Sequence, residues 1–409
     1  MRSVFLIERV TPTTKGMTMP FTGKATYSGG ATLPDIAEDI SDIIGLISPH
    51  ETPLLDHLGD PQKSATSTIH EWLEDTLLPN QDTINDAVYS DPLTDTSFVV
   101  SHADRFRVGD QVQVDGSREV MFVTAVDTGT NTLTVVRGYG GTTAEALFDT
   151  GVLHILGNAA IEGGDRPGTR FTNRVRKQNY TQIFTSSVEV SGSQQAVQTI
   201  GLDDELDYQK QQRLRELIRD LENCVINGVA PQVDPQGNST VRRTMNGIVN
   251  MLQSNLYQPG VNGFPIGGGA GNDSLTEDVL NTALRMIWES SSGQVDTILV
   301  NGFQKRQINS LLFPSKYYAP EDEDIKNIVS VYESDFGIAR VILNRWVPRD
   351  SVVLIDSSRM SVLPLSGRFF HYKPLSSQGD VEVGEIIGEY TLEMKNENAH
   401  GIISGLSVS

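Results

Sequence analysis

The chain of 409 residues has few of the residue types on which most small chemical sites depend. Its single cysteine, Cys224, excludes a disulfide framework and any zinc site built from several thiolates. The seven histidines include no pair spaced as His-x3-His, so we expect no metal site. No apolar run approaches the roughly 18 residues that a membrane-spanning helix needs. The sequence therefore predicts a soluble, cytoplasmic protein without membrane contact.

The motifs of common catalytic sites are missing as well. No Gly-x4-Gly-Lys-Ser/Thr loop is present, and the glycine run Gly267–Gly271 lacks the spacing of a dinucleotide-binding turn. The segment Val190-Ser191-Gly192 does not match the Gly-x-Ser-x-Gly pattern of a nucleophile elbow. We therefore predict that the chain is not an enzyme and binds no cofactor.

The charge of the chain is strongly acidic, with a net value of −20, and it is unevenly distributed. A sequence-specific DNA-binding protein needs a basic face for the phosphates, so the charge argues against that class. Fourteen acidic residues and one basic residue, Lys63, lie between Asp35 and Asp95, which we call the acidic block. Five basic residues and no acidic one lie between Arg166 and Lys177, which we call the basic block. The two blocks either meet across a subunit boundary or form separate solvated faces.

Residues 1–34 have the composition of an arm. They are rich in Thr, Gly and Pro, and their only acidic residue is Glu8. Their basic residues are Arg2, Arg9, Lys15 and Lys24. Such a segment is expected to gain order only by lying on another surface, because it has too little apolar surface for a core. Residues 35–60 then predict a short helix and turns, since Pro49 and Pro53 interrupt any long helix.

One long helix is the strongest structural signal in the chain. Between about Leu202 and Ile226, apolar residues recur at three- and four-residue spacing, namely Leu214, Leu217, Ile218, Leu221 and Val225. Acidic residues occupy the first turn, and Asn227-Gly228 supplies the stop. At 1.5 Å per residue the helix is about 37 Å long. Together with a strand predicted over 181–190, it indicates a structural beam that carries no chemistry.

A separate β-rich unit is predicted over residues 98–157. Four short apolar stretches, near Val112, Val120, Leu133 and Leu153, indicate strands. Turn residues separate them at hairpin spacing. About 60 residues are enough for a small barrel or sandwich. The unit is either an insertion within a larger fold or an ordinary second domain with a binding role.

The rest of the chain alternates helices and strands. After a glycine-rich stretch, Asp273 is expected to cap a helix that runs through Trp288. Val295–Val300 predicts a buried strand, and a helix follows at about 303–312. Residues 347–409 return to strands, among them Tyr390–Glu393.

Four local motifs, taken in order, carry more information than any of them alone. They are the segment Asp42–Leu55, the tetrapeptide Ile69-His-Glu-Trp72, Asn179–Phe184 running into Val188–Gly192, and Asp204–Gln209 with Glu216–Glu222. In this order they resemble the major capsid proteins of tailed bacteriophages, with their Hong Kong 97-type fold. The resemblance is to a subfamily with a β-rich insertion in the extended loop, and it covers most of the chain beyond about residue 30.

The resemblance implies an α+β phage major capsid fold with a long spine helix, peripheral and axial domains, an extended loop and a small all-β insertion. The implied parts are an N-terminal arm (1–34), a short helix and turn segment (35–60), extended loop arms (61–97 and 158–192), the insertion (98–157), a peripheral domain (193–235 and 344–409, with the spine helix at 202–226) and an axial domain (236–343).

The resemblance also implies the function. The chain is expected to self-assemble into the pentamers and hexamers of an icosahedral phage head, which encloses double-stranded DNA without sequence-specific binding. Its partners are then other copies of itself, with decoration, scaffolding and portal proteins, and its place is the virion capsid after assembly in the host cytoplasm. Two alternatives stay open, namely an encapsulin-like compartment shell and a multidomain carboxylate-based hydrolase or sugar-binding protein.

The charged blocks supply the candidate residues for contacts between subunits. These candidates are Glu71, Trp72, Glu74, Asp75, Arg166, Arg170, Arg174, Arg176 and Lys177. The candidates for the inner face of the shell are Arg2, Arg9, Lys15 and Lys24. No catalytic, cofactor-binding or metal-binding residue is predicted.

Overall fold

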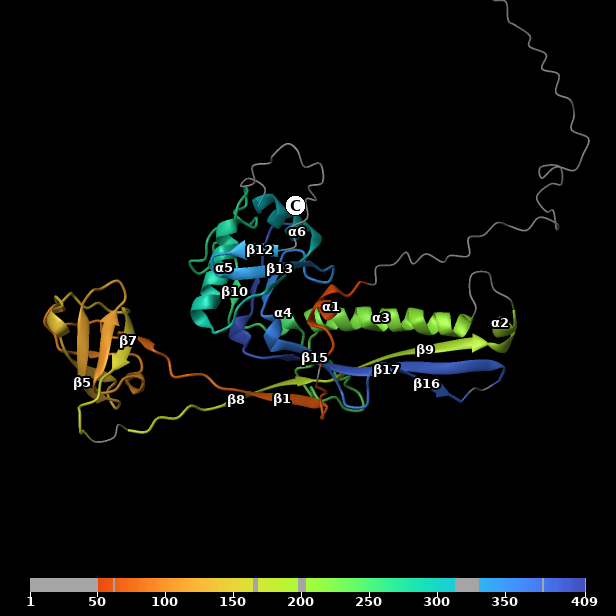
Figure 1. Cartoon of the computed structure of the whole chain (residues 1–409), viewed down its shortest axis with the longest axis horizontal. Helices are drawn as coiled ribbons and strands as arrows, with labels where there is room; N and C mark the ends of the chain where they lie inside the picture. Colours follow the sequence, from red (N-terminus) through yellow and green to blue (C-terminus); the bar gives the residue numbers. More distant parts are fainter. Residues whose placement is uncertain are drawn as a thin grey trace, which may run out of the picture.

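The computed structural model describes residues 51–61, 63–164, 168–197, 204–312, 331–376 and 379–408. Figure 1 shows a body of helices and sheets, from which two extended segments lead to a separate β-unit. The N-terminal arm predicted over 1–34, with Arg2, Arg9, Lys15 and Lys24, lies outside the described residues, and so does Arg166. Among the residues that the structure describes, no helix is long and apolar enough to cross a membrane.

The body is built around helix α3, Glu205–Asn227, which is about 35 Å long at 1.5 Å per residue. Asp204 caps the helix, because its carboxylate accepts the N–H groups of Leu206 and Asp207 at 2.8 and 3.3 Å. The helix ends at Gly228, whose N–H bonds to the carbonyl of Cys224. The predicted long helix is therefore present, and its first described turn begins at Glu205.

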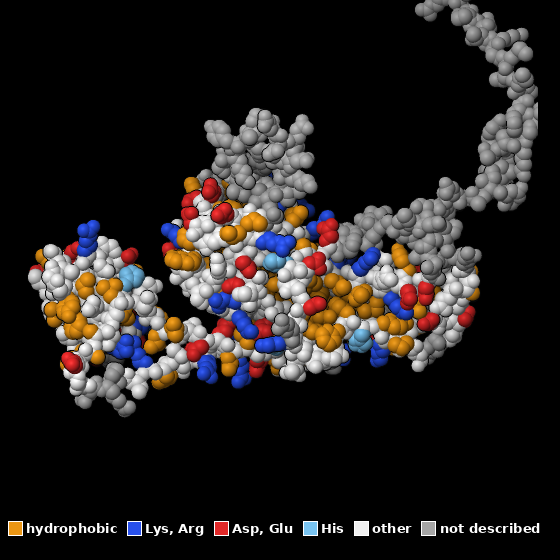
Figure 2. All heavy atoms as spheres, viewed as in Figure 1, with side chains coloured by type: hydrophobic (Ala, Val, Ile, Leu, Met, Phe, Trp, Pro, Cys, Tyr) orange, Lys and Arg blue, Asp and Glu red, His pale blue; other side chains and the backbone are white. Residues whose placement is uncertain are grey.

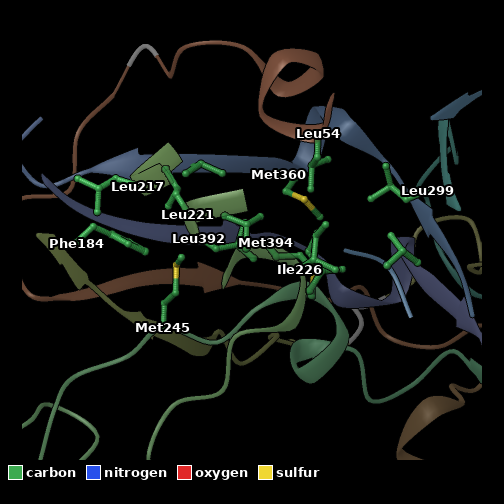
Figure 3. Close-up of a cluster of buried hydrophobic side chains, with 14 of the residues drawn as sticks. Leu54, Phe184, Leu217, Leu221, Ile226, Met245, Leu299, Met360, Leu392 and Met394 are labelled. Atoms are coloured by element: carbon green, nitrogen blue, oxygen red, sulfur yellow. The ribbon is translucent and has the colours of Figure 1, made fainter. Parts of the chain in front are cut away.

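A four-stranded sheet lies against α3. Strand β17, Val381–Met394, pairs antiparallel with β9, Gln182–Ser191, over ten residues. The other edge of β17 pairs with β16, His371–Leu375, and with β15, Met360–Pro364. The buried stripe of α3 joins the core above this sheet, and it consists of Leu217, Leu221, Val225 and Ile226. Figure 3 shows Leu217, Leu221 and Ile226 pointing into that core toward Leu392 and Met394.

A second sheet of six strands, which we call the mixed sheet, forms the other half of the body. Its order is β10 (Leu256–Tyr257), β18 (Gly401–Ile403), β14 (Val352–Ile355), β11 (Thr297–Val300), β13 (Gly337–Leu343) and β12 (Val331–Ser334). Every residue of the two central strands, β11 and β14, is buried. Helices α5, Glu277–Ser290, and α6, Gly302–Leu312, contribute to the same core.

Helix α5 begins later than the sequence indicated. Its N-cap is Thr276, whose hydroxyl accepts the N–H of Val279 at 3.3 Å. Asp273 lies instead in a turn that is closed by a bridge between Gly268 and Ser274. The prediction that Asp273 caps this helix was therefore wrong, because the glycine-rich turn extends further along the chain than its composition suggested.

The separate β-unit is a closed barrel. Its six strands are ordered β2 (Gln81–Thr83), β7 (Val152–Asn158), β4 (Asp110–Val114), β5 (Val120–Asp127), β6 (Thr132–Val136) and β3 (Ser97–Val99). A bridge between Ile84 and Val100 joins β2 to β3, so the first strand meets the last. Closure leaves no free sheet edge within this unit. The barrel has a core of its own, which includes Phe98, Val112, Met121, Leu133 and Leu153.

The barrel reaches further toward the N-terminus than the unit predicted over 98–157. The four strands indicated by the sequence correspond to β4, β5, β6 and β7. Strand β2 was not indicated, and it lies within residues 61–97, where an extended arm was expected. Strands of three residues are too short to show the alternation of apolar and polar residues that marks longer ones.

The remaining elements are short connections. They are α1 (Pro53–Leu58), β1 (Ile69–Glu74), β8 (Val175–Tyr180), α2 (Gly192–Ala196), α4 (Ile248–Met251) and four 3-10 turns, η1 (Ala103–Arg105), η2 (Tyr139–Gly141), η3 (Ser357–Arg359) and η4 (Glu397–Ala399). Strands β1 and β8 pair with each other and form a two-stranded ribbon between the body and the barrel.

Candidate assembly surfaces

Side chains that could bind a metal ion are scattered over the described residues. Within the described ranges, no group of three or more His, Cys, Asp or Glu side chains is placed to hold a metal ion. Cys224 is half-buried on α3, where its sulfur lies 3.4 Å from the amide nitrogen of Gln182. Burial raises the pKa of this thiol above its ordinary value. A thiol held in this way is a packing group, since the thiolate is the reactive form.

The acidic and basic blocks meet within one chain. Strand β1 pairs antiparallel with β8, so that Glu71 faces Gln178 and Leu73 faces Arg176. The Arg176 guanidinium lies 3.6 Å from the Glu71 carboxylate. Beyond the ribbon, the Thr172 hydroxyl donates to Asp75 at 2.9 Å. Charges of both blocks therefore already have partners within the chain, and any contact with a second subunit is made by what remains exposed.

The inner face of the ribbon rests on the body. Trp72 is only 7% exposed, and its indole N–H donates to Glu74 at 2.9 Å. The same carboxylate oxygen accepts the N–H of Asn396 at 2.6 Å. Two of the candidate interface residues, Trp72 and Glu74, thus have their partners inside their own chain.

Asn179 fixes the base of the ribbon. Its side chain is fully buried and donates to the carbonyls of Asn246 and Leu392 at 3.0 and 2.8 Å. Its amide oxygen accepts the N–H of Asn246 at 2.9 Å. A buried amide whose hydrogen bonds are satisfied in this way specifies one orientation of the chain. The ribbon therefore leaves the body at a defined angle.

A second polar cluster lies at the same base. Glu393 is 3.4 Å from His70 and 2.8 Å from the Lys395 ammonium group. The contact with His70, aided by Lys395 and opposed by burial, lowers the pKa of Glu393 to about 2. The carboxylate is therefore charged at any pH near neutrality, and it ties β1 to β17.

The outer face of the ribbon and the segments beyond it are exposed. Leu73 is 62% exposed on this face, next to Glu71 and Arg176. Between ribbon and barrel, Leu77, Ile161 and Phe171 are 91%, 85% and 80% exposed. Isolated exposed apolar residues are common on proteins, but three of them on two extended segments leave these segments without a packing partner.

The candidates of the basic block lie in different surroundings. Arg170 donates to the carbonyls of Asp104 and Phe106 at the base of the barrel. Arg174 and Lys177 are exposed on the ribbon side of the molecule. Figure 2 shows Lys and Arg side chains along the lower edge of the ribbon. Arg174 and Arg176 are therefore the basic candidates open to a second molecule, whereas Lys177 lies opposite Trp72 on the face toward the body.

The sequence did not indicate the exposure of Leu77 and Ile161, and for Phe171 it favoured packing. All three lie in short stretches without an apolar period. The only signal was an apolar side chain in a stretch expected to be extended and solvated.

Comparisons with known proteins agree on one family. Residues 13–407 match the family model described as SU10 major capsid protein. The major capsid protein of Escherichia phage Phieco32 is 23% identical over 303 residues, which make up 64% of this chain and 83% of that protein.

Solved structures support the same fold. The capsid of a native GTA particle matches with a TM-score of 0.52 at 9% identity, over 95% of this chain and 100% of that one. A structure from Microbacterium phage Oxtober96 matches with a TM-score of 0.48 at 12% identity, over 90% and 96% of the two chains. The capsid fold predicted from the sequence motifs is thus confirmed.

Proposed function

The chain belongs to the family of SU10 major capsid proteins, and we propose from this that its copies join into the pentamers and hexamers of an icosahedral phage head. Its function is that of a phage major capsid protein. The head encloses double-stranded DNA, and the chain itself catalyses no reaction. Assembly takes place in the host cytoplasm, and the head adds portal, scaffolding and decoration proteins to the copies of this chain.

The open ribbon is the observation that carries the proposal. Within the described residues, β1 and β8 pair only with each other, so each strand keeps one unpaired edge. A two-stranded ribbon is marginal in water unless a third strand or another surface covers it. Its inner face has the body for this purpose, while the described residues leave its outer face and the segments with Leu77, Ile161 and Phe171 uncovered. A second copy of the chain covers these surfaces in the proposed assembly.

The geometry suits a head-to-tail contact. Ribbon and barrel project from one end of the body, as Figure 1 shows, while α3 and β17 extend toward the other end. A contact between unlike surfaces repeats from copy to copy and closes into a ring when the rotation permits. We assign β17, α3 and the strands beside them to the periphery of such a ring, and the mixed sheet to its axis.

Charge sets the register of this contact in the proposal. Arg174 and Arg176 offer positive charge on a chain whose net charge is −20. Complementary charges contribute more to orientation and to the rejection of wrong contacts than to affinity. An acidic shell also has no strong attraction for the enclosed DNA, which suits a container that releases its contents. The basic residues Arg2, Arg9, Lys15 and Lys24 then face the interior.

Electron microscopy of the purified full-length chain, together with sedimentation velocity, tests the proposal. Closed shells, or rings of five and six, are the expected result. A monomer that persists at every salt concentration, also when the phage's own scaffolding protein is added, would contradict it.

A pair of variants tests the role of the basic ribbon. Arg174→Glu with Arg176→Glu is expected to abolish ring and shell formation, while the far-ultraviolet circular dichroism stays unchanged. Arg118→Glu with Arg285→Glu changes the net charge equally at exposed sites elsewhere and serves as the control. Normal assembly of the first variant at low salt would remove the ribbon charges from the proposed interface. Arg170 is left intact because its guanidinium already holds the barrel base.

A further inference from the structure

Helix α1 begins without a cap of its own. Thr52 stands at the N-cap position, but its side chain accepts no hydrogen bond from the helix. The free N–H groups of Leu54 and Leu55 instead donate to the carboxylate of Glu222, each at 3.0 Å. Glu222 lies 168 positions further along the chain than Leu54, on α3. A side chain of the spine helix thus does the work that a local cap does elsewhere.

Glu222 is also bonded to the mixed sheet. Its side chain is fully buried, and it accepts a third hydrogen bond from the amide of Asn344 at 2.5 Å. Asn344 directly follows β13, and its own oxygen accepts the N–H of Trp346 at 2.8 Å. One carboxylate therefore connects three parts of the molecule, namely α1, the spine helix and the end of a mixed-sheet strand.

The other contacts of α1 place it at the same junction. Leu54 is fully buried in the body core, and Figure 3 shows it beside Met360. His57 makes a 2.8 Å hydrogen bond with the hydroxyl of Thr297, the first residue of β11. The helix is thus wedged between the spine and the mixed sheet, at the position where residues 1–50 join the body.

We propose that Glu222 is a positioning residue that fixes α1 at the junction of α3 and the mixed sheet, and so sets the point from which the N-terminal segment starts. Its consequence for assembly depends on the function proposed above, whereas the anchoring of α1 is a property of the single chain. In the sequence, the motif Glu216–Glu222 was identified only as part of the long helix. The positioning of α1 by Glu222 goes beyond that structural role.

The charge of Glu222 is not balanced by a cation in the part of the chain that the structure describes, where no Lys, Arg or His forms an ion pair with this carboxylate. The basic groups on the elements packed against it have other partners: His57 bonds to Thr297, Arg340 lies 3.5 Å from the His57 ring, Arg345 lies 3.7 Å from Glu51, and Arg219 pairs with Asp220. Asp56, on α1, adds a second negative charge nearby. Burial, opposed by the three donors and aided by Asp56, raises the pKa of Glu222 above its ordinary value.

This shift has a defined sign. Because the pKa in the folded chain is raised above its ordinary value, the folded chain takes up a proton on Glu222 more readily than the unfolded one does. The contribution of Glu222 to the stability of the fold therefore has its full value at acid pH and falls as the pH rises through the pKa of the folded state. A glutamine at position 222 does not titrate, so the dependence disappears with it.

Hydrogen exchange on the full-length chain tests the assignment. Glu222→Gln keeps the shape of the side chain but turns one acceptor oxygen into a donor, so at least one of the three hydrogen bonds is lost. The amides of residues 54–58 are expected to exchange about tenfold faster, as the loss of one hydrogen bond to a buried charged group predicts. The amides of α5 and of the barrel keep their rates. Protection of α1 in the parent chain, corrected for intrinsic rates, rises as the pH falls toward the ordinary pKa of a glutamic acid, and the variant lacks this rise.

Glu397→Gln is the matched control. Glu397 likewise accepts two consecutive backbone N–H groups, those of Gln253 and Ser254 at 2.7 and 2.8 Å, together with the Ser254 hydroxyl at 2.6 Å. Its replacement is expected to speed exchange at these two amides and to leave α1 and its pH dependence unchanged.

Three results would overturn the assignment: unchanged protection of α1 in Glu222→Gln, equal acceleration in all elements, or a pH dependence that survives the substitution. The yield of shells, measured on the same samples, is expected to fall with the protection of α1. Failure of the parent chain to form shells would count against the proposed function alone, since the exchange rates do not depend on it.

Discussion

The barrel and the ribbon are both antiparallel β-structures on the same arm, yet they differ in what each requires. The barrel closes through the Ile84–Val100 bridge and buries its own core. Among the described strands, the ribbon of β1 and β8 has two free edges and no core between its strands. It is held on its inner face by the body, through Trp72 and Asn179, and its outer face is bare.

The difference shows where the chain is complete and where it is not. A closed unit of this size can satisfy its hydrogen bonds and bury its apolar residues alone. An open ribbon needs other surfaces to complete its hydrogen bonds and to bury its apolar residues. The barrel is expected to be stable by itself, whereas the ribbon is expected to depend on the surfaces around it. The following experiments test these two expectations.

The largest effect is expected in the barrel. Glu119 is buried and bound by Arg137 through two hydrogen bonds of 2.8 and 2.7 Å. Burial alone would raise the pKa of Glu119, but Arg137 and the N–H groups of Glu145 and Gly138 outweigh it and leave the pKa below its ordinary value. Arg137→Ala leaves this carboxylate without its cation, which costs about 3–5 kcal/mol. Scanning calorimetry is expected to show an early transition for the barrel and an unchanged one for the body.

Arg118→Ala, a neighbouring exposed arginine, is the control and is expected to shift neither transition. A single transition that moves as a whole in Arg137→Ala would show that the barrel is not independent of the body.

A smaller effect is expected on the inner face of the ribbon at low pH. Because the pKa of Glu393 is lowered, its contribution to stability is present above the ordinary value of 4.5 and is lost as the pH falls toward about 2. The loss is about 2 kcal/mol once residual solvent screening is allowed for. Exchange of the amides of residues 69–74, normalised to the barrel, is expected to accelerate between pH 5 and pH 2.5, and Glu393→Gln removes this dependence.

A pH dependence that persists in Glu393→Gln would assign the response to another group. No acceleration at all would mean that the ribbon does not depend on this contact with β17.

The smallest effect is expected on the outer face of the ribbon in an isolated chain. The side chains of Arg176 and Glu71 are 68% and 40% exposed, and a pair of this kind contributes less than about 1 kcal/mol. Arg176→Glu is therefore expected to leave the urea midpoint of the unassembled chain nearly unchanged. A loss above about 2 kcal/mol would show that the outer face stabilises the single chain, which the comparison of barrel and ribbon denies.

The sequence predicted the parts of the fold that carry a period. The stripe of Leu217, Leu221 and Val225 predicted α3, and alternation predicted the four longer strands of the barrel. Strand β17 was indicated only at its end, over Tyr390–Glu393, because Gly384 and Gly388 interrupt its pattern. A Cβ atom at these glycines would lie within 2.4 Å of the rings of Tyr372 and Phe370, so the neighbouring strand explains what the pattern could not.

Site residues were predictable as charges but not as partners. The acidic and basic blocks are evident in the sequence, whereas the register that brings Glu71 to Arg176 spans more than a hundred residues. The same holds for Glu222, whose donors Leu54 and Asn344 lie 168 and 122 positions away along the chain. Contacts of this kind follow from tertiary packing, and no local sequence pattern predicts them.

The bare segments between ribbon and barrel have a consequence for the lifetime of the chain in the cell. Proteolytic enzymes cut exposed, extended stretches most readily, and the segments with Leu77, Ile161 and Phe171 are of this kind in a free copy. A copy built into a shell would have them covered. We therefore expect proteolysis to remove surplus copies and to spare assembled ones. The exposed segments would then mark unassembled copies for degradation.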